Sequence, residues 1–138
     1  MLYAFCFVFK YFFGTLLAIQ DMRFLAVSVS YLALFILLYV IQNIMVSGLH
    51  FESFLISFLL VPLYFKKEMG LGDKLFLGAI SPFMPPWDLI LFWIASGCIG
   101  MFFGTMLIRK HTQKIPFITC LVLAIFMIDW LQILFQYE

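Results

Sequence analysis

The chain has 138 residues, of which 66% are hydrophobic and 11% are charged, and its formal net charge is +1. Its mean hydropathy of +1.15 excludes an ordinary soluble domain, and no basic cluster interleaved with aromatic residues indicates nucleic-acid binding. We therefore expect an integral membrane protein in contact with the lipid bilayer, all-α, forming one polytopic helix bundle over residues 1–138.

Six apolar stretches follow one another along the chain, and each is a candidate membrane crossing. They run over about Leu2 to Ile19, Phe24 to Val46, Phe51 to Phe65, Leu75 to Met84, Leu89 to Ile108 and Ile115 to Phe135. The first has no basic start and no small-residue cleavage site after it, so we expect a retained helix rather than a signal peptide. The third and fourth are short. We expect the fourth helix to begin within Gly70-Leu71-Gly72-Asp73 and to end at Pro85-Pro86, because proline cannot continue a helix. The sequence predicts about six transmembrane helices.

Basic residues occur in alternate connections between these stretches. Seven of the eight follow the first, third or fifth stretch: Arg23, Lys66, Lys67, Lys74, Arg109, Lys110 and Lys114. The connections on the other side contain no Lys or Arg. The positive-inside rule then predicts that the basic side is cytoplasmic and that both termini lie on the opposite side.

Two acidic residues fall at the same cytoplasmic boundary in this topology. Asp21 ends the first stretch, and Asp73 precedes the fourth. An acidic side chain deep in a bilayer costs about 2.5 to 3.5 kcal/mol on insertion scales, so such residues are candidates for function. The structural alternative is that each acid lies in the headgroup region beside a basic neighbour, Arg23 or Lys74.

Two glycines precede the second acid, in the order Gly70-Leu71-Gly72-Asp73. Each glycine costs about 1 kcal/mol relative to alanine inside a helix, and its missing Cβ lets another chain approach the backbone closely. The glycines could also simply begin a helix. Two carboxylates held close together share one proton, so one can act as a base and the other as an acid on a water molecule and a peptide bond.

Three segments of the chain resemble the type IV prepilin peptidases, a family of membrane aspartic proteases. They are Asp21-Met22-Arg23 after the first stretch, Gly70-Leu71-Gly72-Asp73-Lys74-Leu75 before the fourth, and Ile115-Pro116-Phe117 at the start of the last. The resemblance implies an aspartic endopeptidase of the inner membrane without a cofactor or metal. It would cleave the short basic leader of a prepilin or pseudopilin-like protein at the cytoplasmic boundary.

The resemblance also implies roles for individual residues. Asp21 and Asp73 would be the catalytic acids, Gly70 and Gly72 would give the substrate access, and the basic residues Arg23 and Lys74 would support the site. The chain departs from the family's common pattern at Val27-Ser28 and Ile118-Thr119, where Ile-Pro and Gly-Pro often stand, and in the lysine that directly follows the second acid.

The cysteines indicate a short form of this family. Larger members add a cytoplasmic loop with paired Cys-x-x-Cys motifs and methylate the new N-terminus, and that loop is absent here. Cys6, Cys98 and Cys120 are scattered through the apolar stretches, which favours packing residues over a zinc site or disulfides. We therefore expect cleavage without N-methyltransferase activity.

Two other functions remain open from the sequence. Asp21 and Asp73 could carry protons or cations in a transporter or channel subunit, since buried acids serve that purpose too. The chain could also be a degenerate peptidase retained as an assembly partner. Lys10 and Asp129 lie within the first and last stretches, where they could pair or reach the interfaces separately. The oligomeric state is open.

Overall fold

The chain folds into α-helices joined by short connections. The computed structural model describes residues 1–24, 26–46, 48–64, 71–108 and 116–136. Within these ranges there is no strand, which confirms the all-α class. The helices are α1 (Leu2–Phe24), α2 (Val29–Val46), α3 (Phe51–Tyr64), α4 (Leu71–Ile80), a short 3-10 helix η1 (Ser81–Phe83), α5 (Pro86–Ile108) and α6 (Phe117–Gln136).

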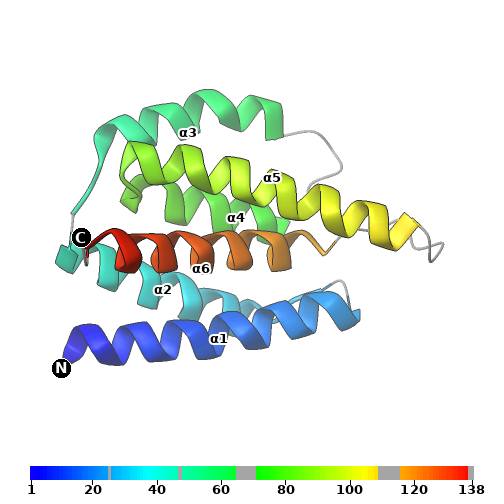
Figure 1. Ribbon diagram of the computed structural model, residues 1–138, viewed down its shortest axis with the longest axis horizontal. Coiled ribbons are helices and arrows are strands. Elements are labelled where there is room, and N and C mark those ends of the chain that lie inside the picture. The colour runs from blue at the N-terminus through cyan, green and yellow to red at the C-terminus, as the bar shows by residue number, and fades with distance from the viewer. Residues whose placement is uncertain (25, 47, 65–70, 109–115, 137–138) are drawn as a thin grey trace.

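The helices run along the long axis of the molecule in alternating directions (Figure 1). The C-terminal ends of α1, α3 and α5 and the N-terminal ends of α2, α4 and α6 lie at one end, which we call the Asp21 end. The two chain termini lie at the other end, which we call the terminal end. Helix α1 packs against α2 and α6, α6 packs against α5, and α2 packs against α4.

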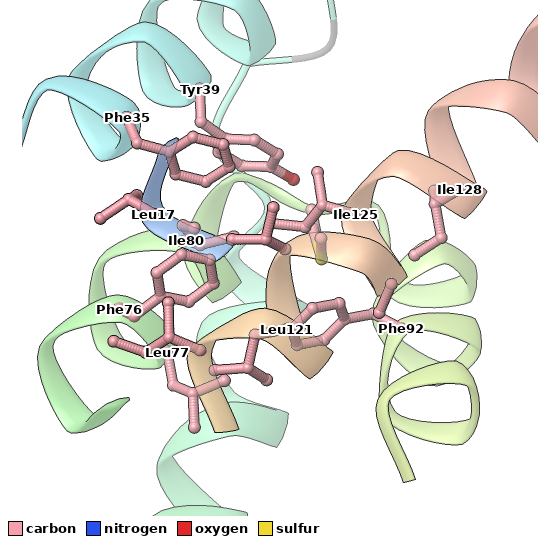
Figure 2. Packing of buried hydrophobic residues seen from close by; sticks show 14 of the residues in the cluster. Leu17, Phe35, Tyr39, Phe76, Leu77, Ile80, Phe92, Leu121, Ile125 and Ile128 are labelled. Carbon is pink, nitrogen blue, oxygen red and sulfur yellow. The ribbon is translucent and has the colours of Figure 1, made fainter. Parts of the chain in front are cut away.

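The centre of the bundle is α6. Half of its apolar segment is buried, against 22% in each of α1, α2 and α5. Its residues Leu121 and Ile125 lie among Leu17 of α1, Phe35 of α2 and other core side chains (Figure 2). The rings of Phe35 and Phe76 stack with centroids 5.6 Å apart, which joins α2 to α4. The start of α6 is therefore fixed by neighbours on several sides.

Four helices are long and apolar enough to cross a membrane, among the residues that the structure describes: α1, α2, α5 and α6. Helices α3 and α4 have 14 and 10 residues. At a rise of 1.5 Å per residue they extend over about 21 and 15 Å, less than a hydrocarbon core of about 30 Å. The structure therefore supports four crossings by length and composition, where the sequence predicted about six.

The helix boundaries also differ from those expected. Helix α1 continues to Phe24 instead of ending near Ile19, so Asp21 lies in its last turns. Helix α4 is described from Leu71, which agrees with the expected start within Gly70-Leu71-Gly72-Asp73, and it ends at Ile80, before the expected end at Pro85-Pro86. The chain then tightens into η1, which contains Pro82, before α5 begins at Pro86. Hydropathy does not detect this change because the apolar residues continue through it.

Candidate functional site

Asp21 is buried between α1 and the first turn of α6. Only 6% of the surface of Asp21 is exposed. The backbone N–H of Thr119 donates a hydrogen bond to Asp21 Oδ2 over 2.8 Å, and the Thr119 hydroxyl donates to the same oxygen over 3.1 Å. Asp21 is therefore held in one position by α6.

The local cause of this contact is the start of α6. The first backbone N–H groups of a helix have no partner within the helix, and the helix dipole favours a negative charge there. Pro116 stands immediately before α6 and has no N–H of its own, so the orphan donors begin with the residues that follow it. Asp21 supplies from α1 the acceptor that a capping residue supplies locally in other helices. This contact is structural whether or not Asp21 is catalytic.

Asp73 lies in the first turn of α4 and is half-buried. The neighbouring Gly72 packs beside the same turn of α6. A Cβ at Gly72 would lie 3.6 Å from Ile118 Cδ1 and 3.9 Å from side-chain atoms of Leu32 and Val27. These are ordinary contact distances, so a side chain at position 72 would meet packed side chains rather than open space. Whether the backbone here admits a peptide stays a prediction.

The first turn of α6 thus touches the segments that bear both acids. Thr119 binds Asp21 of α1, and Ile118 packs beside Gly72, the residue before Asp73. The ends of these helices lie together at the Asp21 end (Figure 1). The sequence analysis missed the role of Thr119, although it noted Ile118-Thr119 as a departure from the family pattern.

The supporting residues are placed only in part. Arg23 is exposed and Lys74 is half-buried. Gly70 lies outside the described residues. So do most of the basic residues expected at this end: Lys66, Lys67, Arg109, Lys110 and Lys114.

A second polar group lies inside the bundle. Lys10 Nζ is 2.5 Å from Asp129 Oδ2, so of the two arrangements that the sequence left open the structure has the pairing, which joins α1 to α6. The Lys10 side chain is fully buried, and its ammonium group lies 5.4 to 5.6 Å from the ring centroids of Phe7, Tyr11 and Tyr39. The negative faces of these rings add to the neutralisation of the buried cation.

The cysteines are free thiols. Cys6 and Cys120 are buried, as expected for packing residues, whereas Cys98 is exposed on α5. No group of three or more His, Cys, Asp and Glu side chains placed to hold a metal ion occurs in the described part of the chain.

The chain was compared with protein-family models, curated proteins and solved structures, and none of them matches it. The resemblance to the prepilin peptidases therefore rests on the three short sequence motifs alone.

Proposed function

We propose that the chain is a membrane aspartic endopeptidase that removes the short basic leader of a prepilin-like or pseudopilin-like protein. The observation that carries the proposal is the first turn of α6, where Thr119 holds Asp21 and Ile118 packs beside Gly72. This turn links α1 and α4 at one end of the bundle, as a pair of acids acting on one peptide bond requires.

The proposed chemistry uses the two carboxyl groups and one water molecule. The ionised carboxylate takes a proton from water as the water oxygen attacks the peptide carbonyl carbon. The protonated carboxyl donates its proton to the carbonyl oxygen, and the leaving nitrogen then receives a proton as the carbon–nitrogen bond breaks. Thr119 donates two hydrogen bonds to Asp21 Oδ2. In this proposal the other carboxylate oxygen, Oδ1, therefore gives and takes the proton.

The proposed setting is the inner membrane, with the Asp21 end at the cytoplasmic boundary and both termini on the other side. The basic residues of alternate connections support this orientation. All six α-helices would cross or enter the bilayer. A substrate with one apolar helix would lie against the bundle in the membrane and present its basic leader at the Asp21 end.

Co-expression with a prepilin-like substrate tests the proposal. Wild type, Asp21→Asn and Asp73→Asn would be compared with Asp88→Asn, a matched substitution at the terminal end, where Asp88 Oδ2 accepts a hydrogen bond from Gln132. Mass spectrometry of the substrate would show a new N-terminus with wild type and Asp88→Asn only. Cleavage by Asp73→Asn would overturn the mechanism.

A second candidate function is proton or cation transport, and the depth of the acids favours it. Asp21 lies at one end of the bundle. Asp129 lies within the bundle, where it pairs with Lys10, and Asp88 lies in the first turn of α5 at the other end. Acids at successive depths are typical of a relay. Proton uptake into vesicles containing wild type, but not Asp129→Asn, together with no cleavage of any prepilin-like substrate, would favour this function over the peptidase. A third outcome, substrate binding without either activity, would indicate a degenerate assembly partner.

A further inference from the structure

An apolar groove of about 720 Å³ lies between α5 and α6. The two helices pack side by side (Figure 1). Among the described residues, only those of α5 and α6 line this groove, and none of them is charged. They include Cys98 and Phe102 of α5 and Leu123, Met127, Trp130 and Leu134 of α6. We call this surface the α5–α6 groove.

One face of α6 forms the floor of the groove. Leu123, Met127, Trp130 and Leu134 follow one another at spacings of four, three and four residues. Residues three or four apart lie on the same face of a helix, so these four side chains form one row. The last three of them are exposed by 50%, 59% and 61%. At a rise of 1.5 Å per residue the row extends over about 16 Å, or three helical turns, and it is open to a partner.

The same row leads to Asp21. Thr119 lies four residues before Leu123, so it begins the row at the Asp21 end. Thr119 is only 1% exposed, and its N–H and hydroxyl both donate to Asp21 Oδ2. The groove therefore runs along α6 to within about one helical turn of the residue that holds Asp21. A helix that lies in the groove would point one of its ends toward Asp21.

We propose, on the basis of the proposed peptidase function, that the α5–α6 groove binds the apolar helix of the leader-bearing substrate. The uncharged lining requires an apolar partner, and the direction of the groove requires a partner whose cleavage junction lies at the Asp21 end. A substrate helix that follows the junction meets both requirements. Helices in a membrane associate through van der Waals packing, and a groove surrounds a helix with more partner atoms than a flat surface does.

The spacing along α6 predicts which part of the substrate lies in the groove. Leu123 and Leu134 lie 4 and 15 residues beyond Thr119. These separations correspond to about 6 and 22 Å along the helix axis. With the cleavage junction level with Asp21, the substrate residues in the groove are those about 4 to 15 positions after the junction. Only one face of the substrate helix would touch the groove, so its contacts should recur every three or four residues.

Disulfide cross-linking to Cys98 tests the groove, because this thiol is free, exposed and part of the lining. A prepilin-like substrate would carry a single cysteine, placed in turn at successive positions after the junction. The Asp73→Asn protein would be used so that the substrate remains intact, and each pair would be oxidised in membranes. We expect several-fold more adduct at a few positions of the predicted range than at the positions between them. Cys98→Ser should lose these adducts.

Two matched controls locate the effect. Leu37→Cys in a Cys98→Ser background moves the thiol to an exposed position of α2, which does not line the groove, and it should give no such pattern. Met127→Trp fills the groove and should slow cleavage of the membrane substrate several-fold. Met45→Trp makes the same change at a residue of α2 that is also 50% exposed, and it should cleave at the wild-type rate.

The outcomes separate the groove from the peptidase proposal. Cleavage by wild type with no more adduct at Cys98 than at Leu37→Cys would mean that lipid fills the groove, which overturns the docking site and leaves the peptidase. A disulfide between the Cys98 thiols of two copies, in place of the substrate adduct, would assign the groove to self-association and would also overturn it. Patterned adducts without cleavage by wild type would support the groove and refute the peptidase. Neither adducts nor cleavage would overturn both.

Discussion

The hydroxyl of Thr119 allows a direct test of the Asp21 arrangement. It lies 3.1 Å from Asp21 Oδ2 and 3.2 Å from the carbonyl oxygen of Ala18, so one hydrogen is shared between two acceptors. Valine has a similar shape and lacks the hydroxyl. Thr119→Val therefore removes this donor, while the backbone N–H at 2.8 Å from the carboxylate remains.

The expected loss of stability in Thr119→Val follows from the charge of the acceptor, the Asp21 carboxylate. A hydrogen bond to a charged group contributes about 1.5 to 3 kcal/mol to stability. Because the hydrogen is shared, we expect the lower end, about 1.5 kcal/mol, or about a tenfold change in the unfolding equilibrium. The same substitution should cost much less in an Asp21→Asn background, where the charged acceptor is gone.

A double-mutant cycle measures this difference. Wild type, Thr119→Val, Asp21→Asn and the double variant would be compared by equilibrium unfolding, and we expect a coupling energy of at least about 1 kcal/mol. Thr119→Ser keeps the hydroxyl and should remain near wild type. Strictly additive effects would refute the assignment of Thr119 as the partner of Asp21.

The same variants separate capping from catalysis. If the proposed peptidase needs Asp21 in a fixed position, Thr119→Val should cleave a prepilin-like substrate about tenfold more slowly at a temperature where it is folded, and Thr119→Ser should cleave normally. Wild-type cleavage by a destabilised Thr119→Val would mean that the contact only caps α6.

Three further predictions concern the bundle and the product. Lys10→Met and Asp129→Asn should each lower stability by about 3 to 5 kcal/mol, because each leaves an unpaired charge or a broken pair in the interior; unchanged thermal unfolding would exclude a structural ion pair. Gly14→Ala should destabilise by about 1 to 3 kcal/mol, since the new Cβ would lie 2.6 Å from Phe126 Cζ, whereas Gly72→Ala meets only ordinary contacts and should unfold at or slightly above the wild-type temperature; the reverse order would contradict the packing. The cleaved substrate should carry an unmodified N-terminus, and a mass increase of one methyl group produced by the purified chain would contradict this.

The helical class and the order of the apolar segments could be predicted from hydropathy, because each helix is apolar almost throughout. The C-terminal end of α4 could not, since Ser81–Phe83 continues the apolar run while its backbone tightens. Lys10 and Asp129 stand out in the sequence because each is a charge within an apolar helix, but the sequence left open whether they pair or reach the interfaces separately.

The hydrogen-bond partner of Asp21 could not be predicted from the sequence, for a different reason. Thr119 lies 98 residues away along the chain, and its place in the sequence does not indicate a partner on another helix. Only the packing of α1 against α6 shows that its donors turn toward another helix.

The two polar contacts between α1 and α6 also bear on how the protein is made. Lys10 and Asp129 are separated by 119 residues, and translation proceeds at about 5 to 20 residues per second, so about 6 to 24 seconds pass between their synthesis. Throughout that interval Lys10 and Asp21 lack the partners that α6 will bring. The nascent protein therefore carries a lysine and an aspartate without these partners until α6 inserts between its neighbours.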